Sequence, residues 1–597
     1  MSEKPAEVVV IGAGLAGMTA AFHLSQRGYK VTVFEQDSYI GGQFRAVPVP
    51  GRPFFHEHCY HLFEPWYHNF FSLVSGLGLS DRFESRHGVK YLRRGQFPKM
   101  TELNDIGSWS SSLQNLFSGP LSIPDMYLFL YSYVDLLATP LQQDRYRDVI
   151  SVDEFMHSRP YATERSTAMH SNVLLKAFGV PTFQSSAQSY RKFVEFGADK
   201  RSPMFYLMKG NVQDNFWQEL ENIFGKFQGE VQRNRQLNRI EVGDDGKVNR
   251  LHFSRVSLSP TLVDPKKIEV ERLDEPYQVN GSVVLAVPPA SLANLLKPAI
   301  YQRQPDWGKV LKLRTEPMAS VHLHFNDKFV KRLKRYNITS LPREPVVLLD
   351  SRFSITFVDN SRTWKDIKEP YLHVIASDYR ELSSLDHLNP DQYTYQGRAS
   401  GVSESSDITD FNMTCPKSAL DYIMAEVARY VPFDLDELDL GSLEIQSNMY
   451  YPIFINDIGS WPNRPTTKTA FPNLFMAGAH CQNAIDITTV EGAVLSGLEA
   501  AEAVRRRHGV GEPIEIIYPK RRPFYAYTPL QLLGAPYAMI AKVLSEIGDL
   551  RGKEINLSSL RQLAVTREFP TFIADLISAP YHVGTEFLAQ FIRAFRR

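Results

Sequence analysis

The residues near the amino end that could do chemistry are three closely spaced glycines and one acid. Gly12, Gly14 and Gly17 form a G-x-G-x-x-G pattern, and Glu35 follows 21 residues after the second glycine. The first glycine permits a tight turn, the second gives a pyrophosphate access to the backbone, and the third lets a helix pack closely on strands. An acid at this distance accepts hydrogen bonds from ribose hydroxyls. The pattern therefore predicts recognition of a dinucleotide.

Two strands and a helix must position these residues. The apolar run Val8–Ile11 predicts a strand that is buried on both faces, and Lys30–Phe34 predicts a second strand that ends at the acid. Between them, a helical pattern begins near Leu15 and Ala16 and stops at Gly28. The unpaired N–H groups and the positive dipole end of that helix favour phosphate. These features predict an α/β fold with a Rossmann-type nucleotide-binding domain.

The segment after the acid distinguishes between nucleotides. Gly41 and Gly42 resemble the glycine doublet of a flavoprotein superfamily that includes monoamine oxidases, protoporphyrinogen oxidase and plant-type carotenoid desaturases. In that superfamily the doublet lets the backbone approach the phosphate and ribityl portion of the flavin, and a basic residue follows. Gln43 stands where Arg or Lys is usual, so the resemblance leaves the basic contact to Arg45. The resemblance implies that the cofactor is FAD.

Later segments resemble the same superfamily in the same order. Residues 230–242 resemble the strand pair whose backbone meets the adenine, with Leu237 where valine is usual. Residues 283–289 resemble the VLAVPP element that returns the chain to the other domain. Residues 472–478 and 490–497 resemble the C-terminal flavin motif, in which the dipole of a helix N-terminus stabilises the anionic reduced ring.

Two features of the C-terminal motif depart from the superfamily pattern. Ala479 stands where an acid is usual, and the spacing from Gly478 to Glu491 is one residue longer than usual. We expect flavin binding to survive both changes. The residues that the resemblance assigns to FAD are Gly12, Gly14, Leu15, Ala16, Gly17, Glu35, Gln36, Gly41, Gly42, Gln43, Arg45, Leu237, Gly478, Ala479, Glu491, Gly492 and Ala493.

The order of the matching segments predicts a discontinuous domain organisation. The expected units are a glutathione-reductase-like FAD-binding domain at 1–102, 225–297 and 440–508, an α+β substrate domain at 103–224 and 298–439, and a helical extension at 509–597. Within the substrate domain, Ser151–Glu154 predicts a capped helix start, and Asp391–Thr409 predicts a loop. Met126–Leu137 predicts a buried helix, with the wall of an apolar cavity or a membrane-facing lip as alternatives.

The composition excludes several classes of protein. The 597 residues include 66 Lys plus Arg and 66 Asp plus Glu, so the chain has no overall charge bias toward nucleic acid. Three cysteines are too few for a disulfide framework and are typical of a reducing compartment. The first apolar run is too short for a signal peptide or a membrane span. We therefore expect a cytoplasmic protein with no nucleic-acid partner.

One short segment indicates the substrate class. Glu57–Phe63 resembles the E-x-G-x-H-x-F stretch of zeta-carotene desaturases, plant-type phytoene desaturases and hydroxysqualene dehydroxylases, with Cys59 in place of glycine. The resemblance implies desaturation, dehydrogenation or isomerisation of a small apolar, isoprenoid-like substrate, with hydride transfer to flavin N5. His61 is retained in this stretch and is the candidate base, because imidazole titrates near neutral pH. The electron acceptor, oxygen or a quinone, and the oligomeric state stay open.

The histidines near this segment do not predict a metal site. His56, His58, His61 and His68 lie close in sequence, but no HExxH motif or companion cysteine set accompanies them. We therefore expect a structural or flavin-adjacent role for them and no bound metal. Cys59 has no resolving cysteine nearby, so a redox thiol is not expected either.

Two alternative functions remain. Flavin amine oxidases usually place a lysine near flavin N5, at a position occupied here by Ser320, so an amine or amino acid is the second substrate class. The following run, Val321–Phe325, alternates like a half-buried strand. His322 and His324 on it either lie on a solvated face or reach the cavity. The third interpretation is a flavin-bound scaffold with little turnover.

The last residues predict an amphipathic helix. Within Thr585–Arg597, five large apolar side chains share one helical face, and three arginines lie elsewhere. Such a helix either docks onto its own domain, lies on a membrane surface or contacts another subunit. A peripheral membrane contact through this helix is therefore one expectation.

Overall fold

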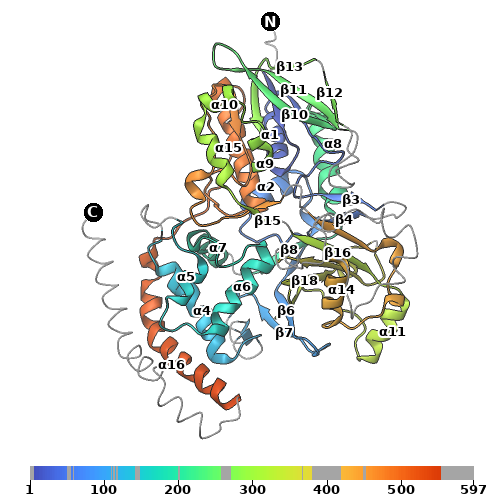
Figure 1. Ribbon diagram of the computed structural model, residues 1–597, viewed down its shortest axis with the longest axis vertical. Helices are drawn as coiled ribbons and strands as arrows, with labels where there is room; N and C mark the ends of the chain where they lie inside the picture. Colours follow the sequence, from blue (N-terminus) through green and yellow to red (C-terminus); the bar gives the residue numbers. More distant parts are fainter. Residues whose placement is uncertain are drawn as a thin grey trace, which may run out of the picture.

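The protein has two lobes, one above the other in Figure 1. The computed structural model describes residues 6–49, 55–57, 59–108, 110–111, 114–115, 119–141, 148–199, 202–256, 270–273, 275–316, 318–365, 367–378, 419–447 and 452–552. The upper lobe surrounds a parallel sheet, and the lower lobe combines a helical part with a second large sheet. The loop predicted at Asp391–Thr409 and the amphipathic helix predicted at Thr585–Arg597 lie outside the described residues.

The parallel sheet of the upper lobe has the strand order β22-β14-β1-β2-β9. Its strands are β1 (Glu7–Ile11), β2 (Lys30–Phe34), β9 (Glu230–Gln232), β14 (Ser282–Leu285) and β22 (Leu474–Met476). Their short valine-rich and leucine-rich runs suit strands that are covered on both faces. The strand, helix and strand predicted at the amino end are confirmed, and segments far apart in the sequence complete the sheet.

Two helices cover this sheet in close contact with each other. α1 (Leu15–Ser25) follows β1, and α15 (Val490–His508) follows β22. A Cβ atom on Gly497 of α15 would clash with the carbonyl oxygen of Ala16. Glycine at that position therefore lets the two helices approach at backbone distance. The other helices of the upper lobe are α2 (His68–Gly76), α8 (Gln218–Lys226), α9 (Pro289–Asn294) and α10 (Pro298–Arg303).

A small antiparallel sheet lies at the top of the upper lobe (Figure 1). It contains β10 (Arg235–Val242), β11 (Val248–Val256), β12 (Val270–Arg272) and β13 (Tyr277–Gln278). Three further strand pairs among the described residues are β3 (Ala46–Pro48) with β4 (Phe55–Glu57), β5 (Phe83–Arg86) with β8 (Phe205–Met208), and β15 (Thr315–Glu316) with β21 (Ile453–Phe454).

The lower lobe contains a seven-stranded sheet with the order β20-β16-β19-β18-β17-β6-β7. Its strands are β6 (Gly88–Leu92), β7 (Thr101–Asn104), β16 (Ala319–His324), β17 (Val346–Leu348), β18 (Ile355–Asp359), β19 (Tyr371–Ala376) and β20 (Glu444–Ser447). α11 (Asp327–Arg335) and α14 (Ala419–Ala428) pack against it. The predicted FAD-binding domain includes residues 1–102 and 440–508. The strands β6, β20 and the start of β7 fall in these ranges but pair within the sheet of the lower lobe. The domain boundaries remain a prediction.

The prediction of a half-buried strand at Val321–Phe325 is wrong. β16 lies between β19 and β20, and five of its six residues are buried. Its two histidines therefore do not form a solvated face. His322 is fully buried, and its Nε2 donates a hydrogen bond to the carbonyl oxygen of Glu57 at 2.8 Å.

The helical part of the lower lobe is formed by several helices, with the last described helix of the chain along its side (Figure 1). They are α4 (Ile123–Ala138), α5 (Val152–His157), α6 (Glu164–Phe178), α7 (Ala187–Asp199) and α16 (Thr528–Gly552). The predicted capping box is confirmed: Ser151 and Glu154 exchange hydrogen bonds at the start of α5. The buried helix predicted at Met126–Leu137 is α4, which packs against α6, α7 and α16. None of the helices in the described part of the chain is long and apolar enough to span a membrane.

Candidate functional site

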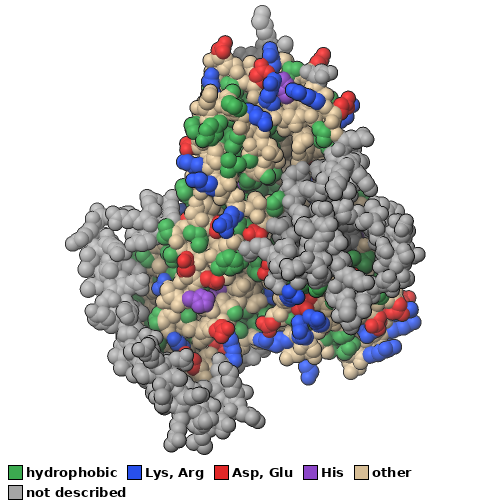
Figure 2. All heavy atoms as spheres, viewed as in Figure 1, with side chains coloured by type: hydrophobic (Ala, Val, Ile, Leu, Met, Phe, Trp, Pro, Cys, Tyr) green, Lys and Arg blue, Asp and Glu red, His purple; other side chains and the backbone are tan. Residues whose placement is uncertain are grey.

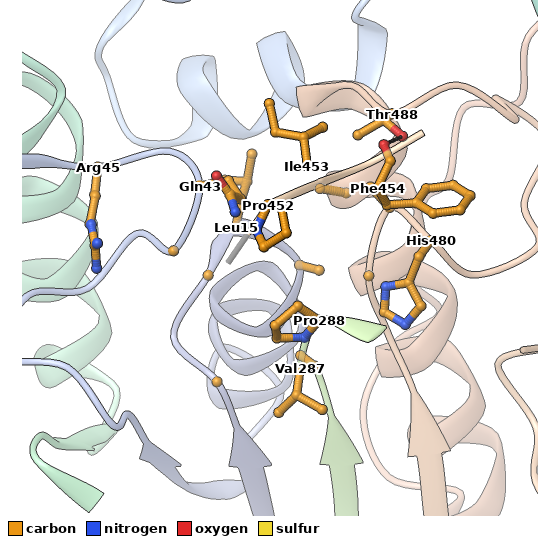
Figure 3. Close-up of a pocket in the computed structure, with 18 of the residues that line it drawn as sticks. Leu15, Gln43, Arg45, Val287, Pro288, Pro452, Ile453, Phe454, His480 and Thr488 are labelled. Atoms are coloured by element: carbon orange, nitrogen blue, oxygen red, sulfur yellow. Dashed lines mark hydrogen bonds between the residues drawn. The ribbon is translucent and has the colours of Figure 1, made fainter. Parts of the chain in front are cut away.

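A cavity of about 410 Å³ opens at the carboxyl ends of the parallel strands. The segments that follow β1, β2, β14 and β22 all line it, and Figure 3 shows several of these side chains converging above the strand ends. Ligands bind at this edge in open α/β sheets, because the loops there can diverge around a ligand. The lower lobe contributes Ile375 of β19 and Lys176 of α6, so the cavity lies between the lobes.

The structure brings most of the predicted site residues into this cavity. Those that line it are Gly12, Gly14, Leu15, Ala16, Glu35, Gln36, Gly42, Gln43, Arg45, His61, Leu237, Gly478, Ala479 and Ala493. Gly17, Gly41, Glu491 and Gly492 do not line it. Gly17 packs against the backbone of Gly12, and a Cβ atom on Gly41 would lie 2.8 Å from Nε1 of Trp217. These two glycines shape the loops around the cavity.

The glycine loop after β1 fits a pyrophosphate. Gly14 has an ordinary φ of −72°, and a Cβ atom placed on it would meet only Cα of Gly42, at 3.9 Å. Glycine at this position is therefore required by neither backbone conformation nor packing. α1 begins here without a side-chain cap and without an acid in its first turn. Its free N–H groups and dipole are thus available to an anion in the cavity.

Glu35 both supports the glycine loop and lines the cavity. One carboxylate oxygen accepts the Ala13 N–H at 2.7 Å, and the other accepts the Asp37 N–H at 2.9 Å. Burial, with a further contribution from the charge of Asp37, raises the pKa of Glu35 to about 7. Arg45 forms an ion pair with Asp37. The carboxylate keeps lone pairs for ribose hydroxyls, since each oxygen can accept two hydrogen bonds.

The first turn of α15 borders the cavity with small and apolar residues. Thr489 caps this helix by accepting the Gly492 N–H at 3.1 Å, and Thr488, Val490 and Ala493 line the cavity beside it. The N-terminus of α15 therefore borders the cavity, as do most of the residues predicted to bind FAD. Its partial positive charge would stabilise negative charge on a bound ring.

Glu491, predicted to bind FAD, does not line the cavity, and its carboxylate binds another helix. Its carboxylate accepts the backbone N–H of Asn69 at 3.0 Å, the Asn69 side-chain amide at 2.7 Å and the Phe70 N–H at 2.9 Å. These donors belong to the first turn of α2, so Glu491 caps that helix and joins it to α15. The side chain is 1% exposed, and its burial raises its pKa to about 7.

Replacing Glu491 with alanine is expected to destabilise the fold by about 3 kcal/mol, because it leaves the buried donors of Asn69 and Phe70 without an acceptor. Glu491→Gln keeps one acceptor oxygen and is expected to cost roughly 1 kcal/mol. Denaturant unfolding monitored by circular dichroism would measure both. Equal stability of Glu491→Ala and the wild type would show that the cap contributes nothing.

The loop after β22 is held by a buried ion network. Arg464 donates hydrogen bonds to the carbonyl oxygens of Ala479, His480 and Cys481 and pairs with Asp486. Lys192 pairs with the other oxygen of Asp486 at 2.6 Å. The loop therefore keeps its shape although Ala479 stands where the superfamily has an acid.

His61 borders the cavity beside a carboxylate. Its Nδ1 lies 3.9 Å from Oε2 of Glu57, and its ring packs edge-on against Phe44. Cys59 lies two residues before His61, and burial raises the pKa of its thiol to about 12. A thiol of this kind is unreactive, because the thiolate is the nucleophile.

Sequence reasoning missed two ionisable groups in the cavity. Glu64 lines it, and its carboxylate makes no hydrogen bond or ion pair with any described residue. Burial raises the pKa of Glu64 to about 8. Lys176 of α6 donates to the carbonyl oxygen of Leu348 at 2.6 Å, and burial lowers its pKa to about 7. Glu64 could have been noticed, because it lies three residues after His61 in the same segment.

Glu64 lies near Tyr67, which is also close to Glu491 in the first turn of α15. The pKa of the Tyr67 hydroxyl is raised well above its ordinary value by burial, and the nearby carboxylates of Glu64 and Glu491 raise it further. Tyr67 is thus close to both acids, and Glu491 belongs to that first turn. An unpartnered carboxyl at this place can accept a proton from a bound molecule or bind a cationic one.

Four histidines stack behind the cavity wall. His56 lies parallel to His322, with ring centroids 3.9 Å apart, and shares a 3.0 Å hydrogen bond with His324. His322 also contacts His373. Burial and the neighbouring His56 hold the pKa of His322 well below its ordinary value. Among the residues that the structure describes, no group of histidines, cysteines and acids is arranged to hold a metal ion.

The residue that the resemblance aligns with the amine-oxidase lysine is a buried serine. Ser320 is fully buried on β16, and its hydroxyl donates to the carbonyl oxygen of Glu57 at 3.2 Å. It does not line the cavity. A side chain at this position is therefore enclosed in the protein beside Glu57 and His322.

Known proteins resemble this chain over most of its length. The 15-cis-phytoene desaturase of Arabidopsis thaliana is 22% identical over 520 residues, covering 84% of this chain and 80% of that protein. A probable zeta-carotene desaturase of Synechococcus elongatus is 22% identical over 527 residues, covering 83% of this chain and 98% of that protein. A redesigned putrescine oxidase has the same fold, with a TM-score of 0.56 and 14% identity. The match covers 84% of this chain and 99% of that protein.

A family-wide comparison agrees with the geometry of the cavity. Residues 15–505 match the family described as flavin containing amine oxidoreductase. The glycine loop, the uncapped start of α1 and the glycine-lined cavity fit FAD, which is the cofactor of this family. The chain therefore belongs to the flavin-containing amine oxidoreductase family and is an FAD-dependent oxidoreductase with a Rossmann-type FAD-binding domain.

Proposed function

We propose that this protein desaturates, dehydrogenates or isomerises an apolar, isoprenoid-like substrate. The observation that supports the proposal is the apolar wall of the cavity, formed by Leu62, Met318, Ile375, Pro452 and Ile453. These side chains come from separate segments of the chain and face the same space as the FAD-binding loops. Each CH₂ group of a hydrocarbon substrate buried there would gain about 0.8 kcal/mol. The names of the phytoene and zeta-carotene desaturases support the same substrate class.

The chain positions the substrate and handles a proton, whereas FAD, when bound, supplies the hydride acceptor. The apolar wall orients the reacting carbon and excludes water, which strengthens electrostatic interactions inside the cavity. The dipole of α15 stabilises negative charge next to Thr489 and Val490. Arg464 contributes indirectly by fixing the loop at Ala479.

Glu64 is the proton acceptor in this proposal. Removal of a hydride from one carbon of a saturated bond leaves a cation, and a double bond forms when the adjacent carbon loses a proton. Glu64 borders the cavity and has no competing partner among the described residues. His61 is the second candidate, and its contact with Glu57 would position its ring. A carboxyl whose pKa lies near 8 has the driving force to take up a proton at neutral pH.

Oxidation of an amine or amino acid is the second candidate function. The same carboxyl, Glu64, could bind a substrate ammonium group instead of accepting a proton from carbon. The solved amine oxidases share only the fold with this chain, so they do not decide the question. Ser320 stands where amine oxidases usually have lysine, which favours the first candidate.

The purified flavoprotein would distinguish these functions under anaerobic conditions. We expect the flavin absorbance near 450 nm to bleach when a polyene or isoprenoid chain is added in detergent, and to persist with amines. Mass spectrometry of the extracted product should show the loss of two hydrogens when the flavin bleaches. An isomer of unchanged mass should form without lasting bleaching, because isomerisation returns the electrons to the product. Bleaching by amines alone, with peroxide released in air, would overturn the proposal.

A further inference from the structure

The C-terminal helix α16 carries a row of exposed apolar side chains. They are Leu530, Leu533, Tyr537, Ile540, Leu544 and Ile547, and each is between 42% and 71% exposed. Their spacing alternates between three and four residues, which places them on one face of the helix. We call this row the α16 stripe. It extends over about 26 Å, since a helix rises about 1.5 Å per residue.

The opposite face of α16 is fixed to the protein by packing and hydrogen bonds. Ala538 and Met539 are buried against Tyr131 of α4. The hydroxyl of Tyr131 donates to the carbonyl oxygen of Gln531 at 3.0 Å, and Ser545 donates to Asp125 at 2.6 Å. The helix therefore cannot rotate to bury the stripe. α16 also lies beyond residues 15–505, which match the family.

The stripe lacks the charges of an ordinary solvent-facing helix. Between Pro529 and Ile547, the only charged residue that is exposed is Glu546, and Lys542 points back to donate to the carbonyl oxygen of Pro160 at 2.8 Å. α11 provides the contrast. Its exposed residues are all charged: Asp327, Lys328, Lys331, Lys334 and Arg335. Figure 2 shows charged side chains of both signs gathered over that part of the lower lobe.

Basic residues lie at the amino end of the stripe. Lys520 and Arg521 are exposed in the segment before α16. Arg521 donates one hydrogen bond to the carbonyl oxygen of Ala484 at 3.1 Å, and Arg522 beside it pairs with Asp199. An uncharged row of Leu, Ile and Tyr next to exposed cations is complementary to an anionic lipid surface. Tyrosine suits the boundary between headgroups and acyl chains, because its ring is apolar and its hydroxyl is polar.

We propose that the α16 stripe lies on the surface of a lipid bilayer that contains anionic headgroups. α16 would rest parallel to the surface, with the stripe among the acyl chains and with Lys520 and Arg521 at the phosphates. A second copy of the chain fits less well. The neighbouring Gly534 and Ala541 face the protein, and Pro536 lies beside the row, so the charged flanks that pair two helices are missing. The inference does not depend on which substrate is oxidised.

Vesicle sedimentation of the full-length flavoprotein tests the proposal. The wild type should pellet with phosphatidylcholine vesicles that contain phosphatidylglycerol, and less with phosphatidylcholine alone or at high salt. The double substitution Leu533→Glu and Ile540→Glu should lower partitioning by at least about tenfold. Leu311→Glu is the matched control and should bind like the wild type, because Leu311 is 68% exposed and lies in the upper lobe.

Flavin content and unfolding temperature of each variant would show that the fold is kept. Leu533 and Ile540 are both exposed enough to tolerate charge.

A milder double substitution, Lys520→Gln and Arg521→Gln, should weaken binding to anionic vesicles only. The proposal is overturned if the Leu533→Glu/Ile540→Glu variant pellets as the wild type does. It is equally overturned if the wild type is a dimer without lipid and that variant is a monomer, since the stripe would then be an interface between copies.

Discussion

Replacing Glu64 with glutamine is expected to lower kcat by about 100-fold or more, because the amide cannot take up the proton that leaves the substrate. The shape of the residue is kept, and Glu64 makes no hydrogen bond with a described residue that glutamine would disrupt. FAD content and stability should therefore stay at the wild-type level. Single-turnover reduction of the flavin, followed in a stopped-flow instrument, would measure the chemical step directly.

The pH dependence of the same reaction follows from the burial of Glu64. Its pKa is raised from the ordinary value to about 8, so most of the carboxyl is protonated at pH 7. Only the ionised form accepts a proton. Flavin reduction should therefore accelerate as the pH rises and level off above about pH 8. Glu64→Gln should lose this dependence, whereas His61→Ala should keep it if Glu64 is the base.

The two candidate functions make opposite predictions for Glu64→Gln. If the carboxyl instead binds a substrate ammonium group, KM should rise while kcat changes little. An unchanged pH profile in the variant, with a full rate of flavin reduction, would remove Glu64 from the mechanism. Loss of the profile in His61→Ala alone would assign the base to His61.

The nucleotide-binding unit was predictable because its constraints are local in sequence. The valine run before Gly12, the glycine spacing and the acid at Glu35 each act on residues that are close along the chain. A buried strand, a tight turn and a helix start can be recognised without knowledge of the rest of the protein. The resemblance to flavoproteins then located the distant strands that complete the sheet and the cavity.

Side-chain direction at Glu491 and burial at β16 were not predictable in this way. Glu491 lies in the first turn of α15, which borders the cavity. Its carboxylate nevertheless binds α2, which is more than 400 residues away in sequence. β16 alternates like a strand with one solvated face. It is buried because β19 and β20 pair with it on both edges and its histidines bond to Glu57, Tyr371 and His56. Both outcomes depend on partners that no local pattern specifies.

Replacing Gly14 with valine is expected to weaken FAD binding by at least about 100-fold, because the added side chain occupies the space of the pyrophosphate. The fold itself should tolerate the change. Gly14 has a φ of −72°, which any residue adopts, and an added Cβ atom meets nothing closer than 3.9 Å. Valine there should therefore give a folded, colourless protein. Absorbance at 450 nm, circular dichroism and titration with FAD would measure this result.

Gly76→Val is the matched control for Gly14→Val. Gly76 ends α2 at an exposed position with no atom within 4 Å of an added Cβ, so this variant should keep both its stability and its flavin. Gly12 makes a further comparison, because its φ of +97° and the nearby carbonyl of Ala286 require glycine for folding. Gly12→Val should therefore lose structure as well as cofactor. If Gly14→Val retains FAD at wild-type affinity, the phosphates do not lie over this glycine, and the geometry derived for the cofactor site is wrong.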